Sequence, residues 1–288
     1  MIKHKKKILI FTILITLLMI FPAYGEEKEL PSKRINLEML DNKINIGVRV
    51  GEDELFINSE VLIKFGIEAN KDNEYTSTNE LSKKYYVFYN QEENILSIKR
   101  DTYRPYSYYI DQDNTGEYSN NNCGPTVATM VLKWLDRDFN ITAEEARNQI
   151  KLNGENWTTD NIKKYVKEND KDTKIIEKNY TNENNIKDEI DKGNLIIACL
   201  NVKYLNQEGE GHFIVINDYI KTIDNKLYFI TQDPASWGEI NSTTGQFIGN
   251  NRYYNSQDID KAIKNWWGKV MIIENNSILE DYINVEAI

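Results

Sequence analysis

Cysteine and histidine are scarce in this sequence, and their scarcity limits the chemistry that it can perform. Among 288 residues there are two of each. Two cysteines exclude a disulfide scaffold and a Cys-rich zinc site. Basic residues number 35 against 45 acidic ones, and the formal net charge of −10 argues against nucleic acid or an anionic membrane as the main partner. With 40% hydrophobic and 11% aromatic residues, the chain has enough apolar material to fold around a core.

Residues 1–25 have the layout of a secretory signal peptide. Four early lysines precede an apolar run at 8–20, and the small residues Ala23 and Gly25 lie just before the expected cleavage site. The alternative is an uncleaved membrane anchor, but the apolar run is shorter than the roughly 20 residues that a span needs. We therefore expect a secreted or cell-surface protein without a transmembrane domain in its mature chain. Cleavage would leave 31 basic and 45 acidic residues, a net charge of −14, and His212 as the single histidine.

A first, small α+β domain is expected at residues 35–100. Segments that alternate in polarity or are rich in β-branched and aromatic residues predict strands at 44–50, 54–57, 84–89 and 95–99. Ser59 is predicted to cap a short helix between them. Residues 53–62, 65–67 and 94–98 resemble the βαββ-type domain at the start of copper amine oxidases and on many Gram-positive surface proteins. The segment contains no histidine, so the resemblance implies an accessory or targeting module without a metal role.

A second domain, residues 105–288, is expected to place helices before an antiparallel sheet. Apolar residues at helical spacing predict a helix at 124–138, and capping residues predict others after Thr142, after Thr159, at 182–192 and after Ser256. Strands are predicted at 195–202, 213–220, 227–231 and 270–273, with a turn at Asp224 and Asn225. Helices followed by an antiparallel sheet make this an α+β domain of two layers.

Cys123 stands directly before the first of these helices, in the sequence Asn-Asn-Cys-Gly-Pro-Thr. Pro125 is tolerated in a first turn, where the N–H that it lacks would have no helical partner. The positive end of the helix dipole favours thiolate over thiol, which suits a nucleophile. The alternative is a small buried hydrophobe, but the polar and turn-forming neighbours are poor core residues. Cys199 lies in an apolar strand and is expected to be buried; a Cys123–Cys199 disulfide would silence the nucleophile.

His212 begins a strand behind a glycine-containing loop, so one edge of its ring can face an open cleft. A lone histidine is usually structural or exposed, yet no other imidazole remains to pair with Cys123 after cleavage. A Cys–His pair supplies both the base and the acid for acyl transfer. Asp233 ends the next strand, and adjacent antiparallel strands can bring it beside His212 to orient the imidazole. The alternative for Asp233 is a residue of an Asp-Pro turn.

These segments together resemble the papain-like cysteine peptidases of family thirty-nine, which includes bacteriocin leader peptidases and exported relatives. The matching residues are Asn-Cys-Gly-Pro-Thr at 122–126 with Ala128 and Met130, Gly-His-Phe-Ile-Val at 211–215, and Asp-Pro at 233–234. The resemblance covers about Tyr106 to Ile273. It implies a papain-like fold, no cofactor, a peptide or protein substrate, and a triad of Cys123 as nucleophile, His212 as base and acid, and Asp233 as orienting residue.

The family also carries a glutamine before the cysteine, whose amide donates to the oxyanion. Gln112 matches that role, with the backbone N–H of Cys123 as the second donor. Six positions before the cysteine, where papain-type enzymes often have glutamine, this chain has Glu117, which is a poor donor. Trp237 could shield the Cys–His pair or form the floor of the cleft, but we expect it to pack in the core.

Three functions remain open at this stage. The first is a secreted cysteine peptidase. The second is another acyl-transfer enzyme with the same triad, such as an amidase, a transglutaminase or a cell-wall hydrolase. The third is an inactive surface-binding module that contacts the cell wall through the first domain. A role in leader cleavage during export is not supported, since no membrane bundle or GxxxxGK[ST] phosphate loop is present. Residues 111–116 begin like a calcium loop, but its twelfth position is Asn122, so no metal site is predicted.

Overall fold

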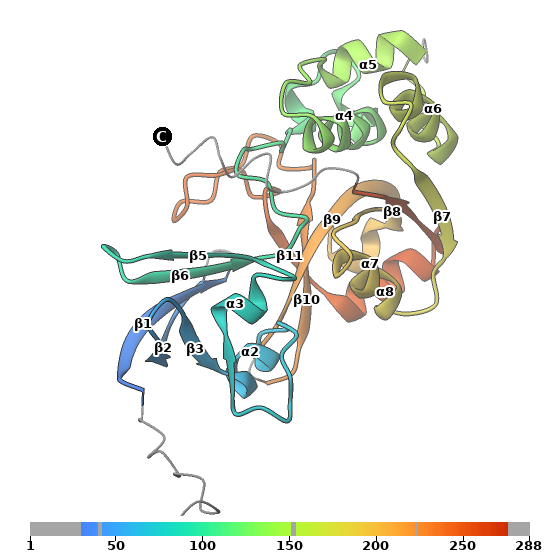
Figure 1. Cartoon of the computed structure of the whole chain (residues 1–288). Helices are drawn as coiled ribbons and strands as arrows, with labels where there is room; N and C mark the ends of the chain where they lie inside the picture. Colours follow the sequence, from blue (N-terminus) through green and yellow to red (C-terminus); the bar gives the residue numbers. More distant parts are fainter. Residues whose placement is uncertain (1–29, 40–41, 151–153, 223, 276–288) are drawn as a thin grey trace, which may run out of the picture.

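The computed structural model describes residues 30–39, 42–150, 154–222 and 224–275. The predicted signal peptide lies outside these residues. The described part is a mixed α+β fold that contains two six-stranded sheets (Figure 1). None of its helices is both long and apolar enough to cross a membrane.

The first sheet has the strand order β4-β3-β2-β1-β6-β5. Its strands are β1 (Ser32–Met39), β2 (Asn42–Val50), β3 (Leu55–Asn58), β4 (Tyr75–Ser77), β5 (Tyr86–Asn90) and β6 (Ile95–Lys99), and its helices are α2 (Ser59–Lys64) and α3 (Thr78–Leu81). Strands β1 and β6 run parallel, whereas the other neighbours are antiparallel. This sheet is larger than a βαββ unit, because β1 and β4 extend it beyond the four predicted strands.

The short helix α2 begins one residue away from its predicted cap. Asn58 is the N-cap, and its side-chain oxygen accepts hydrogen bonds from the amides of Glu60 and Val61. The predicted cap, Ser59, is instead buried, and its hydroxyl bonds Thr76 on β4. Both residues are good caps in isolation, so the packing of β4 against the helix start decides between them.

The second sheet has the order β11-β10-β9-β8-β12-β7, and all of its neighbouring strands are antiparallel. Its strands are β7 (Ile175–Asn179), β8 (Leu195–Asn201), β9 (Gly211–Lys221), β10 (Leu227–Gln232), β11 (Arg252–Asn255) and β12 (Lys269–Ile273). The α-helices of this part are α4 (Cys123–Leu135), α5 (Ala143–Ile150), α6 (Thr159–Asn169), α7 (Asn184–Ile190) and α8 (Ser256–Lys264). The short 3₁₀ turns are η1 (Gln112–Asn114), η2 (Ser119–Asn121) and η3 (Val202–Leu205).

Alternating apolar residues let the second sheet bury both of its faces. On β8, Ile197 packs in the core with α4 and α6, whereas the neighbouring Ala198 packs in the core with α7 and α8. Figure 1 shows the two groups of helices on either side of this sheet. Strand β8 therefore reads as an unbroken apolar run, as expected for a strand covered on both faces.

The two sheets meet at the far end of the β9–β10 hairpin. Ile220 on β9 and Ile230 on β10 belong to the same apolar core as the residues of the first sheet. The hairpin extends from the second sheet toward the first one (Figure 1). The two parts of the chain are therefore packed against each other and share a core.

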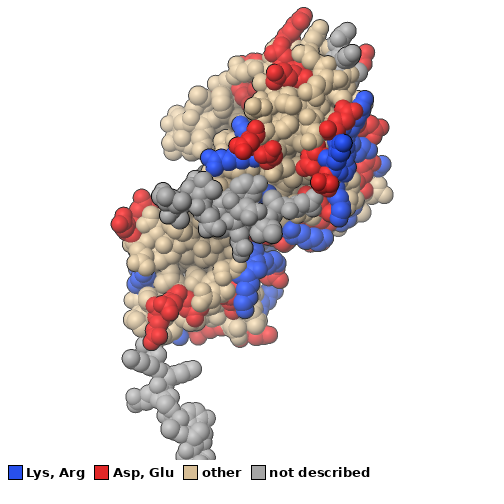
Figure 2. Space-filling view, turned by 45° about the horizontal axis from the view of Figure 1, so that its top comes forward, with Lys and Arg blue, Asp and Glu red and all other residues tan. Residues whose placement is uncertain are grey.

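Charged side chains of both signs are interspersed on the flank that carries α6 and β7 (Figure 2). Lys163 contacts both Asp160 and Glu177, and Lys269 also contacts Glu177. The acidic excess of the whole chain is therefore not gathered into one patch on this flank.

Candidate active site

Cys123 is the first residue of α4, where a backbone N–H has no carbonyl one turn earlier to accept its hydrogen bond. The helix was predicted at 124–138 and lies at Cys123–Leu135. Its side chains between Val127 and Trp134 are almost entirely buried, which anchors the helix and thereby the cysteine at its end. The thiol is half-buried and lines a cleft, so a reactant can approach it.

The loop before Cys123 is held by a buried arginine. Arg147 on α5 contacts the side-chain oxygen of Asn122 and donates to the carbonyls of Asn121 and Glu155 at 2.7 Å each. The amide of Asn122 donates in turn to the carbonyl of Thr115 at 2.8 Å. Asn122 has no exposed surface and its polar atoms are satisfied. The residue beside the cysteine therefore shapes the loop that carries it, a role that its sequence context did not predict.

The register of the β9–β10 hairpin brings His212 and Asp233 together. His212 is the second residue of β9, Asp233 follows directly after β10, and Val215 pairs with Gln232 between them. Nε2 of His212 lies 2.8 Å from Oδ1 of Asp233. The other ring nitrogen, Nδ1, then remains for the thiol of Cys123, which lines the same cleft as His212.

The pKa values of these three groups shift in the directions that favour an ion pair. Burial alone raises the pKa of the Cys123 thiol, but the hydrogen bond and charge of His212 outweigh it and lower the pKa from its ordinary value. Burial alone would lower the pKa of His212, but the charge of Asp233 raises it to about 10. Burial alone would raise the pKa of Asp233, but the charge of His212 outweighs it and lowers that pKa below its ordinary range. The pKa shifts of Cys123 and His212 both favour a thiolate–imidazolium pair over a neutral thiol–imidazole pair.

The carboxylate of Asp233 is completely buried and accepts hydrogen bonds at both oxygens. Oδ1 accepts from His212 and from the amide of Ala235 at 3.0 Å. Oδ2 accepts from the Tyr254 hydroxyl and from Gln207 at 3.2 Å, and Nη1 of Arg252 lies 3.4 Å away. No local sequence pattern marks these three residues, because their side chains meet only across β10, β11 and the loop before β9.

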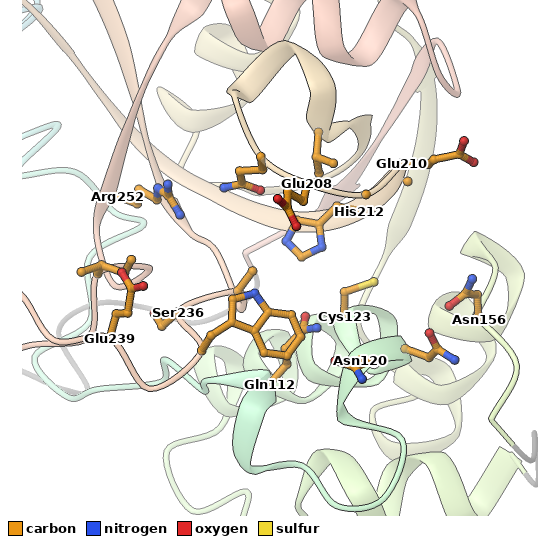
Figure 3. A pocket seen from close by; sticks show the side chains of 18 residues that line it. Gln112, Asn120, Cys123, Asn156, Glu208, Glu210, His212, Ser236, Glu239 and Arg252 are labelled. Carbon is orange, nitrogen blue, oxygen red and sulfur yellow. The ribbon is translucent and has the colours of Figure 1, made fainter.

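Cys123 and His212 face each other across a cleft with a cavity volume of about 540 Å³. In Figure 3, Cys123, Asn120 and Gln112 lie on one side, and His212 and Glu208 lie on the opposite side. The cleft is therefore open at the Cys–His pair. Trp237, expected in the core, lines this cleft with 45% of its surface exposed.

Gln112 lies in the cleft near Cys123, as an oxyanion donor requires. Its side chain is buried, and Nε2 donates one hydrogen bond to the carbonyl of Ser119 at 3.1 Å. A side-chain amide has two donor hydrogens, so one is left for a ligand. Glu117 is exposed and is not among the residues that line the cleft.

The remaining predicted residues also have defined places. Cys199 is buried on β8 opposite Phe213, and both cysteines are free thiols. Asp111, from the calcium-like segment, accepts the backbone amides of Trp237 and Gly238 with its two oxygens, at 3.2 and 2.8 Å. Among the described residues no three His, Cys, Asp or Glu side chains come together as metal ligands.

A thiol at a helix start, in one cleft with an imidazole that a buried carboxylate orients, is the arrangement of a cysteine hydrolase. Comparison with known families agrees with that class. The chain belongs to the Peptidase_C39 like family, whose model matches residues 85–259, from β5 to α8. Membership in this family indicates a peptidase.

A crystal structure from Bacillus anthracis, described as a C39-like peptidase, is 10% identical in sequence to this chain, with a TM-score of 0.41. The similarity covers 59% of this chain and 95% of that one. No curated protein matches the chain.

Proposed function

We propose that this protein is an exported, papain-like cysteine peptidase that cleaves peptide bonds through Cys123, His212 and Asp233. The observation that carries the proposal is the placement of the Cys123 thiol with His212 in one cleft, with the imidazole hydrogen-bonded to the buried carboxylate of Asp233. Family membership supports a peptidase, and the free thiol of Cys123 supports an active nucleophile.

In the proposed reaction, the Cys123 thiolate attacks the scissile carbonyl carbon and forms a tetrahedral oxyanion. His212, as imidazolium, donates its Nδ1 proton to the leaving amine, and the C–N bond breaks to leave a thioester on Cys123. A water molecule then loses its proton to the neutral imidazole and attacks the thioester. The thiolate departs, the acid product leaves, and the original protonation states return.

Two donors are proposed for the oxyanion. The backbone N–H of Cys123 is unpaired within its helix, and the free hydrogen of the Gln112 amide lies on the same side of the cleft. Both donors are fixed before substrate binds, because the helix holds the first and the Ser119 carbonyl holds the second. Preorganised donors of this kind stabilise the transition state without a reorganisation cost.

The decisive variant is Cys123→Ala. It should reduce casein hydrolysis by at least about a thousandfold, since loss of the nucleophile leaves only binding and oxyanion stabilisation. Cys199→Ala is the matched control, because it removes the other thiol and should leave hydrolysis unchanged. If Cys123→Ala retains activity, the nucleophile is assigned wrongly.

The same wild-type protein separates the alternatives. Casein, purified peptidoglycan and an amine acceptor should be tested side by side. Cleavage of casein supports the peptidase, whereas release of peptidoglycan fragments or amine incorporation would assign another acyl transfer to the same site. Binding to peptidoglycan without any turnover would indicate the inactive surface module.

We further propose that residues 1–25 direct export and that the first sheet is an accessory module. Sequence layout supports the first proposal, and the resemblance to the copper amine oxidase N-terminal domain supports the second. Mass spectrometry of the protein secreted by its host should find Glu26 as the first residue. An intact N-terminus on the exported protein would contradict cleavage.

A further inference from the structure

The second oxygen of the Asp233 carboxylate lies in a pocket of hydrogen-bond donors that the reaction itself does not use. Oδ1 faces His212, so the reaction needs only that oxygen. Oδ2 points instead toward the hydroxyl of Tyr254, the amide of Gln207 and the guanidinium of Arg252. Gln207 and Tyr254 also contact each other, with 2.5 Å between Nε2 and the hydroxyl oxygen.

A carboxylate without any exposure must obtain all of its hydrogen bonds from the protein. The carboxylate could make these hydrogen bonds with either oxygen toward His212, or with its plane rotated away from the imidazole ring. Three donors around Oδ2 remove that freedom, because rotation about the Cα–Cβ or Cβ–Cγ bond would break their hydrogen bonds. The position of Oδ1 is therefore set from the opposite side of the carboxylate.

Tyr254 is the best-anchored of the three donors. It lies on β11, paired with Phe229 of β10, and it is buried in the core beneath α8. Gln207 lies on the loop before β9, and Arg252 is partly exposed at the start of β11. A rigid strand positions a side chain more precisely than a loop does, so Tyr254 is the main constraint on the carboxylate.

We infer that Tyr254 is a positioning residue, which acts with Gln207 through Oδ2 of Asp233 to hold Oδ1 against His212. The inference rests on the proposed role of the Cys–His–Asp line and adds a residue to it. Tyr254 does not line the cleft and so has no expected contact with substrate. Its effect should appear in the turnover step and not in substrate binding.

The test compares Tyr254→Phe with Tyr253→Phe. Each removes one hydroxyl from β11, but the Tyr253 ring packs against the core of the first sheet instead of facing Asp233. The measured quantity is the rate of Cys123 alkylation by iodoacetamide at pH 6, followed on the Cys123 peptide by mass spectrometry. This rate reports the thiolate that Asp233 sustains through His212, and it needs no knowledge of the substrate.

We expect Tyr254→Phe to slow alkylation about tenfold, the typical effect of losing one hydrogen bond to a charged group. Tyr253→Phe should leave the rate unchanged. In an Asp233→Asn background, Tyr254→Phe should slow it less than about twofold, because a residue that acts through Asp233 has nothing left to hold. With a cleavable peptide, kcat should fall about tenfold while KM stays constant.

An equal slowing in both backgrounds would overturn the inference, and so would an equal effect of the two tyrosine variants. A loss of alkylation together with a shifted unfolding midpoint in Tyr254→Phe alone would indicate a structural role. If alkylation follows the expected pattern but no substrate is cleaved by the wild type, the positioning role stands and the peptidase proposal fails. The two claims are thus separable.

Discussion

At the scale of single residues, the two cysteines show how surroundings decide reactivity. Cys199 is enclosed in an apolar strand, and burial raises the pKa of its thiol to about 12. Cys123 is also desolvated, but the hydrogen bond and charge of His212 reverse the direction of its pKa shift. The pKa of the same residue type is thus raised on β8 and lowered at the start of α4. The apolar neighbours of Cys199 in the sequence correctly predicted that it is buried.

The dependence of Cys123 on His212 gives a prediction about pH. Because the pKa of His212 is raised to about 10, imidazolium persists across neutral pH, and its charge lowers the pKa of Cys123. His212→Ala removes that charge, so the pKa of Cys123 rises and its thiolate fraction below pH 8 falls. Alkylation by iodoacetamide at pH 6.5 should then slow at least about tenfold, and the difference should narrow above pH 9, where a free thiol ionises anyway.

Cys199, the second thiol of the chain, supplies the control for this measurement. Cys123→Ala leaves only Cys199, whose raised pKa should make alkylation slow at every pH below 10. In the wild type, the thiolate–imidazolium pair should have its upper pH limit near 10, where His212 deprotonates, and its lower limit where the thiolate of Cys123 takes up a proton. A wild-type profile with a single midpoint near that of free cysteine would contradict the ion pair.

At the scale of elements, the sequence predicted the features that depend on local patterns of residues. The apolar face of α4, the Thr142 capping box and the turn at Asn225 all form, the last with φ of +67°. The strands β7 and β11 were missed, because one is an edge strand with charged residues and the other has only four residues. These elements depend on their neighbours in the sheet more than on their own sequence.

The residues of the candidate site likewise divide into those that local sequence patterns identified and those that they did not. Cys123 and His212 were identifiable because each stands at the start of a predicted element. Tyr254 and Gln207 were not, because their contacts with Asp233 exist only after β10, β11 and the loop before β9 have come together. Residues that support a reacting group from behind carry no local sequence signal, and only three-dimensional neighbours identify them.

The clamp by Asp111 on the loop after Asp233 gives a prediction at this scale. Its carboxylate holds the amides of Trp237 and Gly238, and Trp237 adopts a left-handed φ of +53°, which is uncommon for a bulky residue. Asp111→Ala should release this segment from the cleft wall. We expect KM for a peptide to rise about threefold to tenfold, with a smaller change in kcat, since the two hydrogen bonds to this segment are lost together with a third to the amide of Asp113.

Asp113→Ala is the matched control, because Asp113 is an exposed carboxylate on the same short turn. It should leave KM and kcat unchanged. Steady-state kinetics of both variants, with Cys123 alkylation as a check on the catalytic pair, would test the clamp. An unchanged KM in Asp111→Ala would show that the loop keeps its place without the carboxylate.

At the scale of the whole molecule, one buried arginine ties the two sheets together. Arg100 follows β6 directly and donates to the carbonyl of Gly66, which follows α2 in the first part of the chain, at 2.7 Å. The same guanidinium contacts Asp191 and Asp218, which lie after α7 and on β9. The ring of Tyr219 covers one face of the guanidinium, with its centroid 3.9 Å from Cζ of Arg100. The junction is therefore a buried charge network and not a loose linker.

Arg100→Leu should destabilise the whole chain more than any surface change. It would leave the buried carboxylate of Asp218 without its cation, and such a loss typically costs about 3–5 kcal/mol. Burial already raises the pKa of Asp218 from its ordinary value despite the opposing charge of Arg100. Without Arg100 that pKa should rise further, so stability should fall as pH increases from about 4, the ordinary aspartate value, toward the raised pKa of Asp218, because the unfolded chain releases this proton first. Urea unfolding at pH 5.5 and pH 8 measures both effects.

Lys84→Met provides the comparison, since Lys84 pairs with Glu68 on the surface of the first part of the chain. An exposed ion pair contributes less than about 1 kcal/mol, so this variant should unfold near the wild-type midpoint at both pH values. Adding Asp218→Asn to Arg100→Leu should remove the pH dependence and recover part of the loss, because the group that needed compensation is gone. If Arg100→Leu is no less stable than Lys84→Met, then the shared apolar core of Ile220 and Ile230 with the first sheet joins the two parts without help from charge.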